Sequence, residues 1–297
     1  MDISADFEKR VSGAWGDDGK QWLKNLPDIL DQCATKWDLT MEKSTYRLSY
    51  NYVTNVKRRS GQTAVLKVGY PHRELFQEMD AVIAFSSGKG VKVLETDRDL
   101  GAMLLQKIMP GTTLAEISED EATEIAVDII KDFPVDVPED KTFPKLSDWA
   151  NVIVTMKKET CPFSHEHLIK AEKIFVELEM TKKIAKLLHG DLHHDNILKD
   201  ETEGWIVIDP KGVIGDPTYE AARFLHNPPA LLEENFDPEV VLEKRIKIFA
   251  ERMKQDRSRI IKWTYFDCVL TACWALEDNN DGWKNSIECA EIFESML

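Results

Sequence analysis

The chain has 297 residues, of which 43% are hydrophobic, and its formal net charge is -15. This length and composition suffice for a substantial buried core in one large or two moderate domains. The acidic balance argues against a nucleic-acid-binding protein, which needs a basic face, and permits a cationic ligand, although solubility alone also explains it.

Membrane insertion and secretion are not expected. No apolar run approaches the roughly 18 residues of a transmembrane helix, and the first residues lack the basic and apolar zones of a signal peptide. The five cysteines include no CxxC pair and fit reduced thiols better than disulfides or structural zinc. We therefore expect a cytoplasmic protein with no membrane partner.

The first third of the chain predicts a helix followed by an antiparallel sheet. Apolar residues recur at helical intervals over residues 20–37. Alternating residues from Thr45 to Val56, a turn at 58–61 and the apolar run 64–68 predict a β-hairpin. Residues 90–95 and 101–106 predict two further strands. A break at 107–111 suits a hinge, so we place a domain boundary near Lys107.

Lys67 is a charged residue in the middle of an apolar strand. A buried lysine requires an anionic partner. The next predicted helix, over residues 71–86, carries Glu74 and Glu78 one turn apart on one face. We expect one of them to pair with Lys67, although a solvent-facing lysine and two surface glutamates would fit the same pattern.

The remaining two thirds of the chain predict mainly helices. Ser118 to Glu121 forms a capping box that opens a helix to about residue 131. Asp216-Pro217 and Asp237-Pro238 each place an N-cap before a first-turn proline, which predicts helices toward His226 and Met253. Further helices are predicted over residues 145–159, 164–180, 257–277 and 282–296. The prediction is an α+β protein with a small lobe, 1–107, and a larger helical lobe, 108–297.

Three polar residues between Leu187 and Gly212 stand at intervals that phosphoryl-transfer enzymes need. Asn196 follows Asp191 by five positions, and Asp209 ends the apolar run 205–208. In such enzymes the first aspartate orients the acceptor hydroxyl, while the asparagine and the second aspartate hold Mg²⁺ through oxygen atoms. An Asx-rich turn between strands uses the same residue types. Three residues at this spacing favour the catalytic interpretation.

The histidines around this motif suggest a second enzyme class. His189, His193 and His194 lie close to acidic residues in the sequence, as in a zinc hydrolase, but the HExxH pattern is missing. We expect His189 to brace the loop through hydrogen bonds and His193 to be a packing residue.

The stretch 187–228 resembles the aminoglycoside phosphotransferase family, whose signature contains His-Gly-Asp as at residues 189–191. Residues 208–212 and 215–219 are most similar to the branch of aminoglycoside 6-phosphotransferases, which are streptomycin kinases, and hydroxyurea kinases, and the similarity covers most of the chain. It implies a protein-kinase-like two-lobed fold that uses ATP and Mg²⁺ to phosphorylate a hydroxyl of a small molecule.

The resemblance also implies roles for individual residues. Asp191 and His189 would be catalytic, and Asn196 and Asp209 would hold the metal. Lys67, which we expect to pair with Glu78 rather than Glu74, would steady the nucleotide phosphates.

The nucleotide-covering loop would be residues 49–53. It contains no glycine, so the Gly-rich signature is absent. Ser49 and Asn51 are the candidate phosphate donors, and backbone groups near Gln106 and Ile108 would face adenine. Only seven residues separate Asp209 from Pro217, which leaves little room for a peptide platform and favours a small acceptor.

An acidic turn near the end of the chain is the candidate acceptor site. Glu277, Asp278 and Asp281 lie between Trp274 and Trp283. The carboxylates would pair with amines or guanidinium groups while an indole covers a sugar ring. A solvated turn between two packed helices is the alternative.

The predicted function is ATP-dependent phosphorylation of an aminoglycoside such as streptomycin. The alternatives are a kinase of hydroxyurea or of another small metabolite, a metal-dependent hydrolase, and a non-catalytic kinase-like binding protein.

Overall fold

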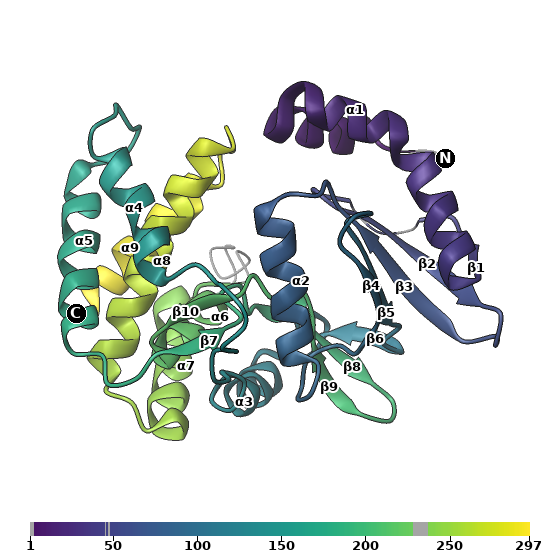
Figure 1. The fold of residues 1–297 in the computed structure, drawn as a ribbon. Coiled ribbons are helices and arrows are strands. Elements are labelled where there is room, and N and C mark those ends of the chain that lie inside the picture. Colours follow the sequence, from purple (N-terminus) through teal and green to yellow (C-terminus); the bar gives the residue numbers. More distant parts are fainter. Residues whose placement is uncertain (1–2, 45, 47, 228–236) are drawn as a thin grey trace. The chain divides into compact units, whose positions relative to one another are not determined.

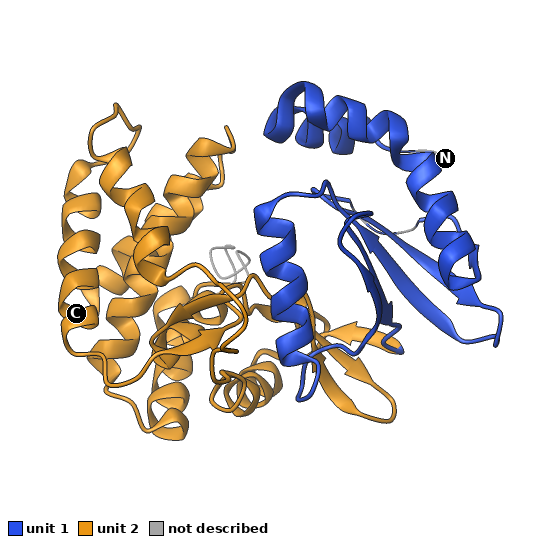
Figure 2. Cartoon of the chain, viewed as in Figure 1, with its two compact units in different colours: residues 1–109 blue, residues 110–297 orange. Residues whose placement is uncertain are grey.

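The computed structural model describes residues 3–44, 46, 48–227 and 237–297. The chain divides into two compact units, Met1–Met109 and Pro110–Leu297, coloured separately in Figure 2. This division falls beside the boundary that we expected near Lys107.

Within its described residues, the amino-terminal unit contains a five-stranded antiparallel sheet in the order β1-β2-β3-β5-β4 (Figure 1). The strands are β1 (Leu39–Met41), β2 (Tyr52–Arg58), β3 (Thr63–Val68), β4 (Val93–Asp97) and β5 (Ala102–Gln106). The predicted hairpin is present as β2 and β3, with register from Tyr52↔Val68 to Lys57↔Thr63. Gly61 adopts a φ of 87° in its turn, a conformation that glycine adopts readily.

The strand predicted from Thr45 begins only at Tyr52, so the prediction for the preceding residues is wrong. Tyr46 lies in a bend, where its hydroxyl donates to Asn55 (2.8 Å) and accepts from Lys107 (2.7 Å). These side-chain contacts take the place of a continued strand. Thr45 and Arg47 lie outside the described residues.

Helix α1 (Ala5–Trp37) begins well before the predicted residue 20. Ser4 caps its first turn, and Gly16 interrupts it with a φ of 56°. This glycine break obscures the helical period in the sequence. On both sides of this break, buried residues of α1 belong to the hydrophobic core that the helix forms with one face of the sheet. Helix α2 (Arg73–Phe85) supplies Glu78, the partner of Lys67. Neighbouring residues of a strand point to opposite faces of the sheet, so Lys67 points away from the face that its core neighbours Leu66 and Val68 share with α1.

The carboxy-terminal unit is mainly helical. Its helices are α3 (Glu119–Ile130), α4 (Leu146–Met156), α5 (His165–Met180), α6 (Glu220–Leu225), α7 (Pro238–Met253), α8 (Arg257–Glu277) and α9 (Trp283–Ser295). Helix α8 is the centre of this unit, because nearly all its residues from Ile260 to Cys273 are buried and it contacts α4, α5, α6, α7 and α9.

Short strands and turns of this unit position the loops of the site. A three-stranded sheet in the order β6-β8-β9 and an antiparallel pair of β7 and β10 form among the described residues. The strands are β6 (Pro110–Thr113), β7 (Lys186–Leu188), β8 (Ile197–Asp200), β9 (Gly204–Val207) and β10 (Val213–Gly215). The 3-10 turns are η1 (Leu114–Glu116), η2 (His194–Asn196) and η3 (Pro217–Tyr219).

The three predicted helix starts at Ser118, Asp216 and Asp237 are confirmed, but the capping box predicted at Ser118 is not formed. The Asp216 carboxylate accepts from the N–H of Thr218 (2.9 Å), and that of Asp237 accepts from the N–H of Glu239 (3.1 Å). Ser118 is the N-cap of α3 but forms no side-chain capping bond. The reciprocal capping box lies one turn earlier, between Thr113 and Glu116, because the 3-10 turn η1 begins there.

No helix within the described ranges combines the length and apolarity needed to cross a membrane.

Candidate active site

The site is built on the loop between β7 and η2, which begins at His189. Gly190 adopts a φ of 79°, and a Cβ atom there would lie 2.6 Å from the Trp149 ring. Both the conformation and the close approach require glycine. Immediately before Asp191, the loop therefore packs closely between strand β10 and helix α4.

His189 braces this loop, as predicted. Its Nε2 lies 2.8 Å from the carbonyl of Ile208, its Nδ1 accepts the N–H of Asp191 at 3.1 Å, and its carbonyl accepts the N–H groups of Lys211 and Gly212. Burial lowers the pKa of His189 to about 4. A neutral ring can donate on one nitrogen and accept on the other, as these contacts require.

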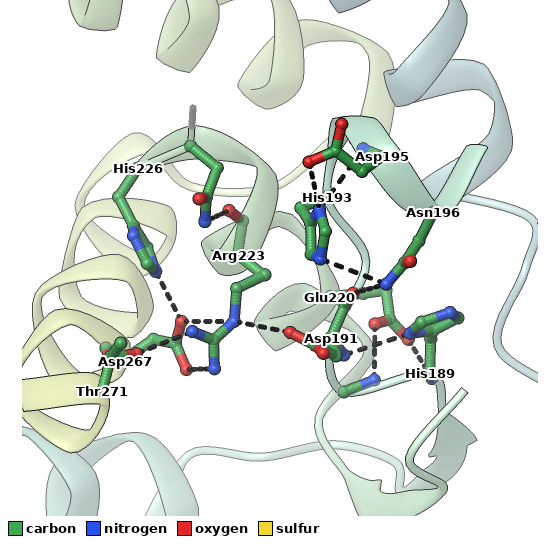
Figure 3. Close-up of polar contacts among 12 residues, drawn as sticks. His189, Asp191, His193, Asp195, Asn196, Glu220, Arg223, His226, Asp267 and Thr271 are labelled. Atoms are coloured by element: carbon green, nitrogen blue, oxygen red, sulfur yellow. Dashed lines mark hydrogen bonds and ion pairs between the residues drawn. The ribbon is translucent and has the colours of Figure 1, made fainter. Parts of the chain in front are cut away.

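Asn196 is held against the same loop. Its Nδ2 donates to the backbone carbonyl of Asp191 at 2.9 Å and lies 3.2 Å from Nε2 of His193 (Figure 3). His193 is thus a polar neighbour of Asn196 as well as a packing residue. Because the amide nitrogen is used inside the loop, the amide oxygen Oδ1 is the atom left to act as a ligand.

Asp209 is brought beside Asn196 by the β8–β9 hairpin. Ile197 pairs with Val207, and the N–H of Ile208 donates to the carbonyl of Asn196 at 2.9 Å. Asp209 follows with a φ of 57°, which turns the chain out of the strand. The register therefore brings the backbone of Asp209 close to that of Asn196. A carboxylate and an amide oxygen are hard donors that Mg²⁺ prefers, and Mg²⁺ would complete its coordination with water and phosphate. This donor set fits a magnesium ion.

The arrangement does not resemble a zinc site. No three His, Cys, Asp or Glu side chains gather around a common point in the part of the chain that the structure describes. His194 stacks on Phe224 at a centroid distance of 4.0 Å and is buried. It therefore serves the core.

Glu220 is a residue of the site that the sequence did not reveal. Its carboxylate, at the start of α6, accepts the N–H of His189 (2.7 Å) and that of Gly190 (3.0 Å). Burial raises the pKa of Glu220 to about 7 although both hydrogen bonds favour the carboxylate. Nothing in the local sequence separates this glutamate from an ordinary first-turn residue.

Arg223, one turn further along α6, was also missed. Its Nε lies 3.4 Å from Oδ1 of Asp191 and 3.4 Å from Oδ2 of Asp267 on α8. Burial opposes the charge of Arg223, but Asp267 and Asp191 outweigh it and raise its pKa. Figure 3 shows the guanidinium between these two carboxylates. Asp191 itself is 27% exposed, so its carboxylate still reaches solvent.

In the amino-terminal unit, Lys67 pairs with Glu78. Nζ of Lys67 lies 2.5 Å from the Glu78 carboxylate, with side-chain exposures of 8% and 13%. Glu74 instead lies near His72 and is 87% exposed. Of the two glutamates that the sequence left open, Glu78 is therefore the partner.

The other residues predicted to contact the nucleotide have mixed surroundings. Ser49 is exposed, whereas the side-chain oxygen of Asn51 lies against Gly69. The N–H of Gln106 donates to the carbonyl of Lys92 at 2.9 Å, and Ile108 is buried. The N–H of Gln106 is thus already used within the sheet.

The two tryptophans of the acidic turn pack against different residues. Trp274 contacts Trp149 edge-on at 5.3 Å and lies under the guanidinium of Arg223 at 5.8 Å, so it borders the loop that begins at His189. Trp283 packs on Phe163 at 6.0 Å.

The carboxylates of the same turn, Glu277, Asp278 and Asp281, are exposed. Asp281 pairs with Lys284 at 3.2 Å. Burial and the neighbouring charge of Asp278 raise the pKa of Glu277.

Comparison with known proteins gives consistent matches over most of the chain. A family model described as aminoglycoside/hydroxyurea antibiotic resistance kinase matches residues 36–279. The chain is 26% identical over 276 residues to streptomycin 6-kinase of Streptomyces griseus, covering 90% of this chain and 88% of that protein. It is 26% identical over 268 residues to hydroxyurea phosphotransferase of Kitasatospora aureofaciens, covering 88% and 76%.

A solved structure supports the fold. The choline kinase LicA from Streptococcus pneumoniae superposes with a TM-score of 0.67 at 12% identity, covering 91% of this chain and 99% of that chain. The likeness confirms the predicted α+β, protein-kinase-like fold.

Proposed function

The chain belongs to the aminoglycoside/hydroxyurea antibiotic resistance kinase family and is a small-molecule phosphotransferase, and from this premise we propose that its acceptor is streptomycin or a related aminoglycoside. The phosphoryl donor would be ATP with Mg²⁺. Family membership sets aside the hydrolase and the non-catalytic binding protein as alternatives.

The observation that carries the assignment of roles is the hydrogen bond from Asn196 Nδ2 to the backbone carbonyl of Asp191. It fixes a candidate base and a candidate metal ligand in one loop, and the β8–β9 hairpin adds Asp209 beside them. We assign Asp191 as the residue that accepts the acceptor's proton. Asn196 and Asp209 would hold Mg²⁺, which neutralises charge on the phosphates.

In this reaction the acceptor oxygen forms a bond to the γ-phosphorus, and the bond from that phosphorus to the β,γ-bridging oxygen breaks. The hydroxyl proton passes to Asp191, and ADP leaves with the bridging oxygen. In the amino-terminal unit, Lys67 would bind the nucleotide phosphates and Glu78 would hold its ammonium group in place. His189 positions the loop through its hydrogen bonds.

Hydroxyurea is a second candidate acceptor, because hydroxyurea phosphotransferase is also 26% identical to this chain, which covers 76% of it compared with 88% of the streptomycin kinase. Exposed acidic residues near Trp274 favour the cationic aminoglycoside, since opposite charges attract. Hydroxyurea carries no positive charge to meet them.

One panel decides between these acceptors. ADP release would be measured with streptomycin, other aminoglycosides, hydroxyurea and simple metabolite alcohols at matched concentrations. We expect streptomycin or another aminoglycoside to give the highest kcat/KM, with a phosphorylated product detected by mass spectrometry. Turnover with hydroxyurea or an uncharged alcohol alone would contradict the proposal.

A further inference from the structure

A buried arginine links the candidate base to the interior of the helical unit. Arg223 has a side-chain exposure of 11%, and its Nε lies 3.4 Å from both Asp191 Oδ1 and Asp267 Oδ2. Among the described residues, this Nε has no hydrogen-bond partner within bonding geometry. A buried N–H donor without an aligned acceptor is costly, so its place between two carboxylates requires an explanation.

The rest of the guanidinium is held on α8. Nη1 donates to the hydroxyl of Thr271 at 2.7 Å, Nη2 lies 3.4 Å from Asp267 Oδ1, and the Trp274 ring lies 5.8 Å below. These contacts fix the plane of the group. Its Nε–H edge therefore remains directed at the gap between Asp191 and Asp267 (Figure 3).

Asp267 is itself immobilised. Its side chain is fully buried and accepts the hydroxyl of Tyr219 at 2.5 Å, and His226 Nε2 lies 2.7 Å away. Burial alone favours the neutral acid, but Arg223 and His226 hold the pKa of Asp267 below its usual value. A carboxylate fixed by several partners is a rigid anchor for Arg223.

We propose that Arg223, anchored by Asp267, is a positioning residue that holds Oδ1 of Asp191 and so directs Oδ2 toward the acceptor hydroxyl. This inference rests on the proposed role of Asp191 as the base. When the acceptor binds, the Nε–H of Arg223 donates to Oδ1, which orients the carboxylate and leaves Oδ2 to take the proton. Tyr219, His226 and Thr271 act on the base only through Asp267 and Arg223.

The test compares Arg223→Ala, Arg223→Lys and wild type with the best acceptor of the panel. Losing a hydrogen bond to a charged group lowers kcat roughly 10- to 100-fold, and Arg223→Lys should keep more of the activity because it keeps the charge. The KM for ATP should stay unchanged. Added guanidinium chloride should restore turnover to Arg223→Ala more than an equal concentration of sodium chloride does.

The guanidinium response separates positioning from packing, because a free guanidinium ion supplies the lost N–H donors beside Asp191 but does not repair a packing defect. Arg259→Ala is the matched control, because its guanidinium binds Asp216 and the carbonyl of Leu178 instead. It should lower stability while keeping the guanidinium response of wild type.

If Arg223→Ala does not fold, Thr271→Val keeps the charge of Arg223 and removes the hydroxyl that accepts from Nη1 and donates to the backbone carbonyl of Asp267. It should lower kcat several-fold, again with an unchanged KM for ATP. No guanidinium rescue in Arg223→Ala, or wild-type kcat in Thr271→Val, would overturn the positioning role. Asp191→Asn, assayed in parallel, distinguishes this from failure of the proposed function, because full activity in that variant would remove the base itself.

Discussion

Asn196 donates its side-chain amide to the backbone carbonyl of Asp191 at 2.9 Å, so the candidate metal ligand and the candidate base belong to one rigid loop. The bond fixes which end of the amide faces outward. Its oxygen can serve a cation only while the nitrogen remains bound to the loop.

The first prediction concerns the metal ligands. Asp209→Ala and Asn196→Ala each remove one oxygen donor, so both should raise the Mg²⁺ concentration needed for half-maximal turnover, on the order of tenfold or more. Asp209 should matter more because it is charged. Calorimetry of Mg²⁺-ADP binding gives a second readout. The exposed neighbour Asp195, changed to alanine, serves as control, and a wild-type magnesium dependence in Asp209→Ala would remove that residue from the site.

The second prediction concerns the support beneath the loop. Glu220 accepts two backbone N–H groups, whereas a glutamine can accept only through its one oxygen. At pH 8, above the pKa of about 7, Glu220→Gln should lower the free energy of unfolding by about 1 to 3 kcal/mol and lower kcat. Urea denaturation and ADP release measure the two effects.

Glu177→Gln is a suitable control for this experiment, because the Glu177 side chain is 55% exposed and forms an ion pair with Lys262 near the surface. It should change stability by less than about 1 kcal/mol. If Glu220→Gln behaves like this control, then Glu220 does not hold the loop.

The third prediction is a pH dependence of stability. Burial lowers the pKa of His189 from 6.5 to about 4, so between these values the unfolded chain binds more protons than the folded one. The contribution of His189 to stability is therefore present above pH 6.5 and is lost as the pH falls toward 4, by at most about 3 kcal/mol. Glu220, with its raised pKa, contributes a slope of the opposite sign between 4.5 and about 7.

Urea denaturation at several pH values isolates the histidine. His189→Asn keeps an acceptor near Nδ1 but cannot titrate, so its unfolding free energy should fall less on acidification than that of wild type. The exposed His165, changed to asparagine, should keep the wild-type slope. Equal slopes for all three proteins would contradict a buried neutral His189.

The local parts of the candidate site are the ones that the sequence can suggest. Asp191, Asn196 and Asp209 are joined by one loop and one hairpin, so their spacing in the sequence already indicates that their backbones lie close together. The Asp-Pro helix starts are equally local. Glu220, Arg223 and Asp267 could not be found in this way, because Glu220 contacts a residue 31 positions away and Arg223 one 44 positions away. Tertiary packing brings such groups together: the start of α6 lies against the loop after β7, and α6 also packs on α8.

The amino-terminal unit shows the same limit. The break at Gly16 hid the first half of α1, and the strand expected from Thr45 starts at Tyr52 because Tyr46 binds Asn55 and Lys107 through its hydroxyl. Side-chain contacts of this kind leave no periodic pattern in the sequence.

The fourth prediction tests the acidic turn. Changing Glu277, Asp278 and Asp281 to their amides should raise the KM of a cationic acceptor by about two- to fivefold per carboxylate that pairs with it, and more strongly at low salt, since exposed pairs are screened. The KM for ATP should not change.

A charge-matched variant controls for the effect of the protein's overall negative charge on the binding of a cationic acceptor. Asp17, Asp136 and Asp140 are exposed residues away from this turn in the sequence, and their amides remove the same charge. Equal acceptor kinetics in the two triple variants would mean that the turn is ordinary surface.

The central claim is that Asp191 is the base of a phosphotransferase, and Asp191→Asn tests it most directly. Asparagine is nearly isosteric but cannot take the proton, so kcat with the best acceptor should fall roughly 10²-fold or more, while Mg²⁺-ADP binding by calorimetry and the unfolding transition stay close to wild type. Near-normal turnover in this variant would contradict the account.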